Sequence, residues 1–323
     1  MAESLKHHFV PQVYLRYFAK ERERKKGEYY LYVYDKVQDK TFSRNIDEIG
    51  YEKNFNRVHN GRFLPPVPDN NELHYEKKFQ ELIENDWNSI VHQFTASCTL
   101  STQKKVLSDD MKFMLAKLIL IQSLRTPIAR EITRSIGPKS CKKVFDELTP
   151  IIRDLPREDL KKAFRKMKRE FSFKEDQVKS FHLLVTTDND RIERMAHILV
   201  QNRVWVVYRS PNERYFPFIT SDNPVVFYNP VLDKYGIGPN GINVNTTVIG
   251  FPITPQYYIY SFHKKSPLGD FSCIVGNECI DVDPDIIGII DRHQTNQCYR
   301  QVYLPQEIGE EMMNEEKTRF HHT

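Results

Sequence analysis

The hydrophobic positions near the start of the chain repeat at helical spacing. Residues 7–18 read HHFVPQVYLRYF, in which Val13, Tyr14 and Phe18 are among the residues that fall on one side of a helix. Pro11 suits the first turn of a helix, because its fixed φ and missing N–H cost little there. We therefore expect a short N-terminal helix that docks through its aromatic side chains.

The next segment has the composition of paired strands. Residues 28–36 read EYYLYVYDK, which is rich in the β-branched and aromatic side chains that favour strands, and residues 40–46 are the expected antiparallel partner. Residues 60–71 contain one glycine and three prolines, which interrupt helices and strand ladders alike. The pattern predicts a hairpin followed by a linker or a long surface loop.

A helical block is predicted over residues 71–202. Apolar residues recur every three or four positions over 72–97, and Ser108 can cap a further helix that is apolar nearly all round over 113–124. We expect the 113–124 helix to be the buried centre of the block. Three prolines are expected to divide the following stretch into shorter helices, namely Pro138, Pro150 and Pro156.

From residue 203 the period of the pattern changes from helical to extended. Five strand-like runs are separated by Pro, Gly and Asn clusters, and they begin near residues 203, 215, 223, 245 and 256. Such runs predict an antiparallel sheet. A final helix is expected over 285–297, followed by a short strand over 299–305 and a polar tail that frays.

The order of these elements predicts an α+β fold: an N-terminal helix and β-hairpin, a central helical block, and a C-terminal antiparallel sheet with a terminal helix. We expect a single domain over residues 1–323. Its subregions are the helix with the hairpin, the helical block, the sheet region and a flexible tail, at 5–60, 71–202, 203–305 and 306–323.

Composition narrows the class of protein. The 323 residues are 40% hydrophobic and 28% charged with a net charge of +4, which is typical of a mildly basic globular protein. Five scattered cysteines without a Cys-x-x-Cys pair argue against a disulfide framework or a structural zinc site. Because neither a secretory segment nor a bilayer-length apolar run is found, we expect a cytoplasmic protein without a membrane partner. The phosphate-binding motifs Gly-x-x-x-x-Gly-Lys and Gly-x-Gly-x-x-Gly do not occur.

Two adjacent histidines are the most unusual local feature. The imidazole of His7 or His8 can serve as a metal ligand or as a general base near neutral pH, although neighbouring side chains on a regular element diverge. Glu52 follows the hairpin, where a strand end can present a carboxylate beside an imidazole to a divalent ion. Core or capping roles for the histidines and a solvated Glu52 are the alternatives.

Two further groups of polar residues interrupt apolar segments. Gln122 and Arg125 lie three residues apart near the end of the apolar helix, where a buried guanidinium needs a carboxylate, carbonyl groups or an anionic ligand. Asp222 and Asn223 follow a strand and precede a proline, and Asp222 is a candidate catalytic acid. A structural salt bridge at Arg125 and a turn that only reverses the chain at Asp222 remain open.

Positive charge is concentrated in one predicted helix. Residues 161–169 read KKAFRKMKR, and the stretch 138–179 carries thirteen Lys and Arg against eight Asp and Glu. This concentration fits a contact with a phosphate backbone, whereas a solvated helix face is the alternative. The candidate substrate-binding residues of this run are Lys161, Lys162, Arg165, Lys166 and Arg169.

Several of these segments together resemble a known bacterial family. They are HHFVPQVYLRYFA at 7–19, VYDK at 33–36, EKNF at 52–55, QSLRTP at 122–127, RVW at 203–205 and TSDNP at 220–224. On these motifs the chain resembles the family designated domain of unknown function 4238, from which it departs at Asn56, where an aromatic residue is expected. The resemblance implies a soluble protein of bacteria or mobile elements and brings no assigned activity. It also groups six residues in one recurring constellation, namely His7, His8, Arg16, Glu52, Arg125 and Asp222.

The first functional hypothesis is a nuclease-like phosphodiesterase that acts on a phosphate-containing substrate. An imidazole would act as base or metal ligand, carboxylates would bind the metal or act as acid, and arginines would neutralise the phosphate. The candidate catalytic residues are His7, His8, Glu52 and Asp222. A divalent cofactor, Mg²⁺ or Mn²⁺, would be held by His8, Glu52 and Asp222. The substrate would be held by the basic run together with Arg16, Gln122, Arg125 and Asn223.

The second hypothesis belongs to another class. Here the protein is a non-catalytic recognition module for nucleic acid or for another protein, and the same polar side chains form a buried network that needs no metal. The basic helix would then dock the partner. A role in toxicity or phage defence is compatible with either hypothesis.

Overall fold

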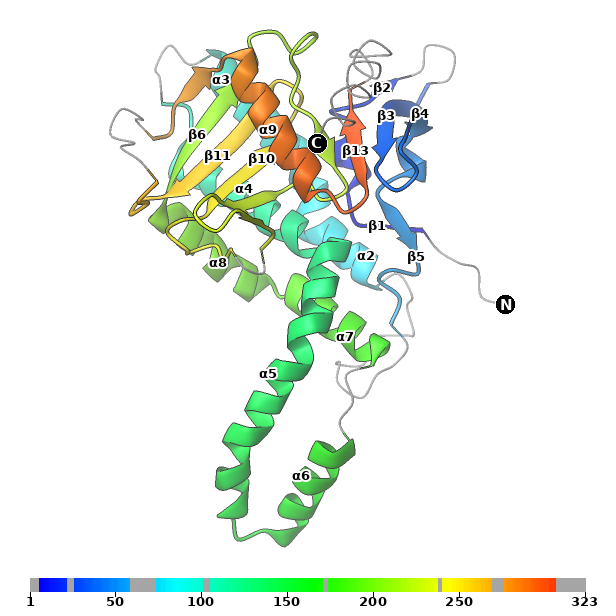
Figure 1. Cartoon of the computed structure of the whole chain (residues 1–323), viewed down its shortest axis with the longest axis vertical. Coiled ribbons are helices and arrows are strands. Elements are labelled where there is room, and N and C mark those ends of the chain that lie inside the picture. Colours follow the sequence, from blue (N-terminus) through cyan, green and yellow to red (C-terminus); the bar gives the residue numbers. More distant parts are fainter. Residues whose placement is uncertain are drawn as a thin grey trace.

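The computed structural model describes residues 6–21, 26–58, 74–100, 105–170, 174–237, 240–268 and 276–305. Among the described residues, two large sheets, a two-stranded sheet and most of the helices form a body, from which one pair of helices projects (Figure 1). The mixture of a helical block, sheets and a late helix confirms the predicted α+β class. The predicted linker at 60–71 and the tail at 306–323 lie outside the described residues.

The N-terminal segment forms the predicted hairpin and the predicted short helix. Strand β3 (Tyr29–Asp35) pairs antiparallel with β4 (Lys40–Asn45) along the whole length of β4. Helix α1 (Gln12–Leu15) begins directly after Pro11, and the residues before it form strand β1 (Lys6–His8). β1 pairs antiparallel with β5 (Tyr51–Lys53), and this small ladder carries the two histidines.

The C-terminal runs are strands, as predicted, but they are divided between two sheets. A six-stranded sheet has the order β12-β6-β11-β10-β8-β9, and a second sheet has the order β2-β3-β13-β7, with β4 beside β3. Within the six-stranded sheet the described ladders are antiparallel, except that β12 runs parallel to β6. The strands not yet bounded are β2 (Lys20–Glu21), β6 (Arg203–Arg209), β7 (Thr220–Ser221), β8 (Val226–Asn229), β9 (Lys234–Tyr235), β10 (Val248–Pro252), β11 (Tyr257–His263), β12 (Cys279–Asp281) and β13 (Gln301–Leu304).

The second sheet joins distant parts of the sequence. β13 lies between β3 and β7 and pairs antiparallel with both. The run at 215–222 therefore contributes β7 to a sheet with the N-terminal hairpin and not to the six-stranded sheet. The expected final helix is α9 (Pro284–Gln297), and Asp283 caps it by accepting a hydrogen bond from the Asp285 N–H.

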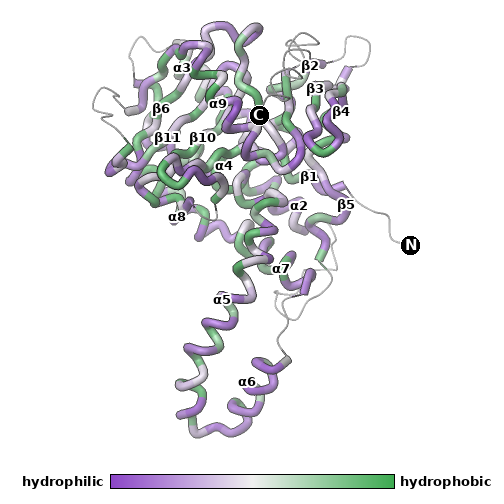
Figure 2. The backbone as a smooth tube through the Cα atoms, in the orientation of Figure 1, coloured by the Kyte–Doolittle hydropathy of each residue, from purple (hydrophilic) through white to green (hydrophobic). Residues whose placement is uncertain are grey.

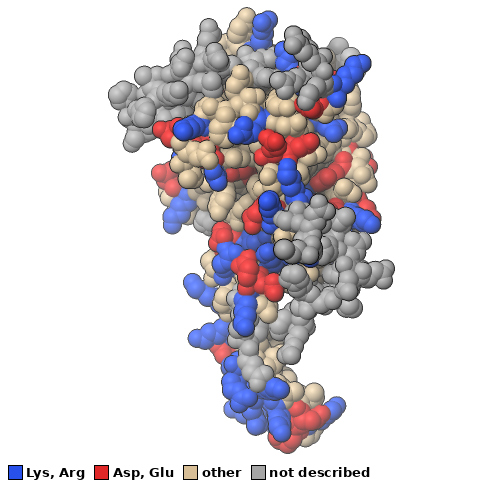
Figure 3. All heavy atoms as spheres, turned by 90° about the vertical axis from the view of Figure 1, so that its right-hand side faces the viewer, with Lys and Arg blue, Asp and Glu red and all other residues tan. Residues whose placement is uncertain are grey.

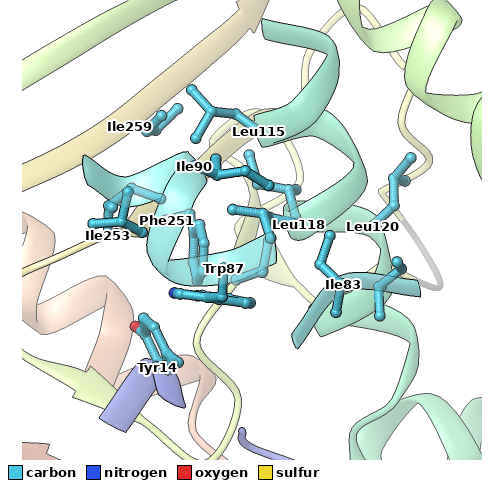
Figure 4. Packing of buried hydrophobic residues seen from close by; sticks show 14 of the residues in the cluster. Tyr14, Ile83, Trp87, Ile90, Leu115, Leu118, Leu120, Phe251, Ile253 and Ile259 are labelled. Atoms are coloured by element: carbon cyan, nitrogen blue, oxygen red, sulfur yellow. The ribbon is translucent and has the colours of Figure 1, made fainter. Parts of the chain in front are cut away.

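The helical block is centred on α4, as predicted. Ser108 caps α4 (Asp109–Leu124) by accepting a hydrogen bond from the Met111 N–H at 3.1 Å, and the helix is buried on most sides. Figure 4 shows Leu115 and Leu118 converging with Trp87 and Ile259, so that helices and sheet share one core. The other helices are α2 (His74–Phe79), a π-helical turn (Gln80–Glu84), α3 (Asn85–Leu100), α5 (Pro127–Arg153), α6 (Glu158–Glu170), α7 (Glu175–Thr186) and α8 (Asn189–Asn202), with a 3₁₀ turn at Ile46–Glu48.

The prediction that prolines divide the stretch after α4 is wrong for two of the three. Helix α5 runs unbroken through Pro138 and Pro150. A proline ring clashes with the Cβ of the preceding residue in a helix, and Gly137 has no Cβ. Pro150 lies in the last turn of α5, so the hydrogen bond lost with its missing N–H is followed by only three more helical residues. Only Pro156 separates two helices, in the turn between α5 and α6.

Helices α5 and α6 form the projecting pair, which we call the arm (residues 137–170). The 27 residues of α5 give a helix about 40 Å long at 1.5 Å per residue. Figure 2 shows hydrophilic and hydrophobic positions alternating along both helices. Within the described ranges, no helix combines the length and the apolar character needed to cross a bilayer.

Candidate functional site

The β1–β5 ladder separates the two histidines. His7 lies opposite Glu52 in the ladder and His8 opposite Tyr51, and the alternation of a strand sends neighbouring side chains to opposite faces. His7 is fully buried and His8 is half-buried. The side chain of Glu52, in contrast, is exposed. The expected divergence of the imidazoles is therefore present.

His7 is held in one tautomer by the backbone. Its Nδ1 accepts a hydrogen bond from the Asn56 N–H at 2.7 Å, so a neutral ring carries its proton on Nε2. Burial lowers the pKa of His7 to about 4, and the positive charges of Lys179 and Arg130 add to the shift. At neutral pH His7 is thus an uncharged imidazole whose Nδ1 is already used.

His8 contributes its main chain as much as its ring. Its ring Nε2 lies 3.3 Å from the Gln12 Nε2, and burial followed by the charge of Arg125 lowers the pKa of His8. Its carbonyl oxygen accepts a hydrogen bond from the Arg125 Nη2 at 2.6 Å. The Gln122 Nε2 donates to the Phe9 carbonyl at 3.1 Å. The end of α4 therefore clamps the backbone just after β1.

Arg125 is a buried, paired cation. Its side chain is 2% exposed, its Nη1 donates to the Glu84 Oε1 at 2.8 Å, and its guanidinium lies 4.5 Å from the centre of the Phe79 ring. The carboxylate, the carbonyl of His8 and the ring together satisfy most of a planar guanidinium. The structural salt bridge left open by the sequence is the arrangement found.

Arg130, Asn56 and His182 complete this region; Arg130 and His182 were not singled out from the sequence, and Asn56 was noted only as a departure from the family pattern. The Arg130 Nη1 donates to the Phe55 carbonyl at 2.8 Å, and its guanidinium lies 3.3 Å from the centre of the Phe55 ring. The Asn56 Nδ2 donates to the Glu76 Oε1 at 2.6 Å. Burial lowers the pKa of Arg130 to about 10 and that of His182 to about 3. The signal available in the sequence was Asn56 itself, a polar residue where an aromatic was expected.

Asp222 and Asn223 lie in a second polar group at the end of β7. The Asp222 carboxylate accepts hydrogen bonds from the N–H groups of residues 299, 300 and 301, at 2.8, 2.7 and 2.8 Å. Burial raises the pKa of Asp222 to about 6, although these backbone donors act in the opposite direction. The Asn223 Nδ2 donates to the Gln297 carbonyl at 3.1 Å. Both residues thus fix the chain between α9 and β13.

The candidate catalytic and substrate-binding residues of the body therefore fall into two groups. The histidines, Gln122 and Arg125 are joined through β1, whereas the contacts of Asp222 go to the loop before β13. Arg16 is exposed and lies 5.3 Å from the centre of the Tyr29 ring. Among the residues that the structure describes, no group of three or more His, Cys, Asp or Glu is arranged to hold a metal ion.

The arm carries the remaining candidates on an exposed helix pair. The rings of Phe145 and Phe164 meet at 5.9 Å between the two helices, and the Lys168 Nζ donates to the Asp146 Oδ1 at 3.0 Å. Residues 139–170 carry eleven Lys and Arg against six Asp and Glu. Figure 3 shows Lys and Arg side chains gathered on the lower part of the arm, with Asp and Glu side chains beside them at its end.

The helical period sorts these charges onto one side. Each residue of a helix is rotated by about 100° around the helix axis relative to the one before it. Moving around each axis in one direction, away from Phe145 on α5 and Phe164 on α6, leads to a set of mostly basic residues. We call this set the basic face: Lys139, Lys142, Asp146, Lys161, Arg165 and Lys168. Lys162 and Arg169 continue it around α6. Lys161 is paired with Glu158 at 2.9 Å, so neutralisation of the basic face is partial.

Comparison with known proteins identifies a family for the chain. The sequence model of DUF4238, described as a protein of unknown function, matches residues 6–306. The chain belongs to this family, as the motifs at 7–19 and 220–224 indicated. Neither a curated protein nor a solved structure gives a match.

Proposed function

Starting from membership in the DUF4238 family, we propose that this protein is a nucleic-acid-binding module that contacts the phosphate backbone with its arm. In this proposal the polar residues of the family motif are structural. The observation that carries the proposal is the segregation of Lys and Arg onto one exposed face of the α5–α6 pair.

The state of the lysines supports electrostatic binding. Within the described residues, no carboxylate lies within 4.0 Å of four exposed lysines of the arm, which are Lys139, Lys142, Lys162 and Lys166. Each of these side chains can neutralise a phosphate and so release a counterion condensed on the nucleic acid. The net excess of five positive charges over 139–170 exceeds that of the whole chain, so the body contributes none of it.

The buried polar residues support a structural role by the partners they already have. Arg125 is occupied by Glu84 and the His8 carbonyl, and three backbone donors surround the Asp222 carboxylate. To bind a phosphate, the Arg125 guanidinium would have to release Glu84 and the His8 carbonyl. Those groups would then lose their hydrogen-bond donor, which costs free energy. The arm lysines face no such cost.

The dependence of binding on salt tests the proposal. We expect the full-length protein to bind duplex or single-stranded nucleic acid without strong sequence preference, with an affinity that falls steeply as salt rises. In a variant with Lys139, Lys142, Lys162 and Arg165 changed to Gln, the negative slope of log K against log[salt] should become shallower by about 3. Fluorescence anisotropy with a labelled oligonucleotide at several salt concentrations measures both quantities.

A matched control separates the arm from general charge. Four exposed lysines outside the arm are changed to Gln in the same way, namely Lys40, Lys105, Lys234 and Lys264. This variant has the same net charge as the arm variant and should keep the wild-type salt slope. Equal losses in both variants, or no binding by the wild type at low salt, would contradict the proposal.

The phosphodiesterase hypothesis stays a prediction. It requires an imidazole of β1 and Glu52 to share one metal with Asp222, whose contacts lie in the other polar group. The same oligonucleotide, incubated with the protein and Mg²⁺ or Mn²⁺, would be cleaved if that hypothesis holds. Cleavage lost in His8→Ala and in Asp222→Asn without a lower melting temperature would favour it over the binding module.

A further inference from the structure

The side of the arm opposite to its basic face is apolar. Moving around each helix axis in the opposite direction, away from the facing rings of Phe145 and Phe164, leads to Val144 and Leu148 on α5 and Met167 on α6. Two antiparallel helices are related by a two-fold axis, so the same rotation on each helix leads to the same side of the pair. We call this side the apolar face, and its residues are Val144, Leu148, Ile151, Leu160 and Met167.

These side chains are unusually open to solvent. Their exposed fractions are 51, 37, 59, 41 and 43% in the order just given. Between them lie the half-buried Cys141 and the small Ala163, so among the side chains described for α5 and α6 no charged residue interrupts the face. Together they expose on the order of 400 Å² of apolar surface, which is the size of the largest apolar patch on a typical monomer, and such patches are often functional.

The residues that border the apolar face indicate what covers it. Glu147 lies along its outer edge on α5, and Asp159 and Lys166 lie along its outer edge on α6. An anionic bilayer or a phosphate backbone would be bordered by cations alone. A border that carries both signs is complementary to a border of the same kind, which a second copy of this chain provides.

The area of the face agrees with that partner. Two copies that pair their apolar faces would bury on the order of 1,000 Å² once the adjoining helix surface is included, which is the lower bound for a specific interface. In that arrangement the basic faces of both arms point away from the contact, so their like charges are kept apart. Repulsion therefore does not oppose the pairing.

We propose that the protein forms a homodimer in which the apolar faces of two arms pack against each other as a four-helix contact. This inference goes beyond the proposed function and holds whether or not the basic face binds nucleic acid. Such a dimer presents two basic faces on opposite sides of one helical bundle. If the proposed function also holds, it could contact two nucleic-acid segments at once.

Sedimentation velocity of the full-length protein tests the inference. Between about 1 and about 100 μM the wild type should shift from monomer to dimer, as a modest apolar interface predicts. The double variant Leu148→Gln with Met167→Gln should weaken the dimer at least about tenfold. A second pair, Leu148→Ala with Met167→Ala, keeps helix propensity and adds no polar group, so it should weaken the dimer without unfolding the arm.

The control lies on the other side of the same helices. Lys142→Gln with Lys161→Gln should leave the dimer unchanged while weakening any binding of an oligonucleotide, so the two proposals fail separately. A wild type that stays monomeric at all concentrations overturns the inference, as does a double variant that dimerises normally. Flotation with phosphatidylserine vesicles completes the test: binding by a monomeric wild type that the Leu148 and Met167 changes abolish would assign the face to lipid instead.

Discussion

Arg125 at the end of α4 and Arg165 in α6 bear the same side chain in opposite surroundings. The side chain of Arg125 is 2% exposed and that of Arg165 is 71% exposed. Arg125 meets Glu84 at 2.8 Å and the His8 carbonyl at 2.6 Å, whereas the nearest partner of Arg165, Glu158, lies at 3.8 Å. The body thus uses its charged groups to hold segments together, and the arm leaves them available.

This contrast shows why residue type alone is a poor guide to the site. A buried guanidinium must find partners within the protein, and once it has them it is costly to move. An exposed one interacts weakly with its neighbours and readily with a polyanion. The motif residues that look most chemical in the sequence are, in the structure, those with the most internal partners.

The largest difference in stability between variants of the body and of the arm is expected when the buried Arg125 is replaced. Arg125→Met leaves Glu84 and the His8 carbonyl without their donor, and we expect the free energy of unfolding to fall by about 3–5 kcal/mol. The same change on the arm, Arg165→Met, should alter it by less than about 0.5 kcal/mol. Urea titration followed by circular dichroism measures both values.

Equal effects at the two arginines would remove the distinction between body and arm. A stable Arg125→Met protein that has lost an activity would mean that the guanidinium serves a ligand and not the fold. The N-terminal ladder offers an independent readout, since hydrogen exchange at residues 6–8 should speed up in Arg125→Met only.

Lowering the pH should weaken the body by a smaller amount. The pKa of His182 is lowered to about 3 and that of His7 to about 4, from 6.5, so the unfolded chain binds protons that the folded chain does not. Stability from these groups is present above pH 6.5 and lost as the pH falls below it. From pH 6.5 to about pH 5 each histidine should cost about 2 kcal/mol.

Asp222 acts with the opposite sign over part of the same range. Its pKa is raised from 3.8 to about 6, so the folded chain gains a proton first and the carboxyl favours folding as the pH falls through 6. The variant His182→Phe lacks one of the buried imidazoles. Its free energy of unfolding, measured by urea titration at several pH values, should therefore change less with pH than that of the wild type. An unchanged slope in that variant would mean that the buried imidazole does not titrate on unfolding.

The smallest expected effect is that of Asp222→Asn. An amide oxygen can replace part of the carboxylate's contact with the three backbone donors, while its NH₂ group faces donors and leaves at least one unpaired. Because the amide also avoids the burial of a charge, we expect a net loss of about 1 kcal/mol at pH 7. Asp154→Asn, at an exposed acid of the arm, is the control and should change nothing measurable. A loss of more than about 4 kcal/mol, or none, would contradict this account.

The periodic parts of the fold could be predicted from the sequence. The alternation in EYYLYVYDK gave β3 and its partner, and the apolar run after Ser108 gave α4 with its cap. These elements follow from local rules of spacing and capping. Helix α5 could not be predicted in the same way. Pro138 is tolerated because Gly137, which precedes it, has no Cβ, and Pro150 is tolerated because the helix ends soon after it. Neither condition is part of the rule that a proline interrupts a helix.

The sequence indicated several residues of the candidate site, but it did not indicate which of them lie together. Spacing indicated that His7 and His8 diverge, and composition indicated a basic helix over 161–169. That His7 binds the Asn56 N–H and that Asp222 binds residues 299–301 depends on contacts between segments 49 and about 80 residues apart. Such pairings are set by the packing of sheets and helices, which single-sequence patterns do not encode.

The position of β13 has a consequence for how the chain is made. Because residues 301–304 supply the strand between β3 and β7, the hairpin leaves the ribosome some 250 residues before its neighbour is synthesised. Until then the free side of β3 is an open edge that another nascent chain can pair with. A chaperone that shields this edge during translation should therefore raise the yield of correctly folded protein more than one that acts after release.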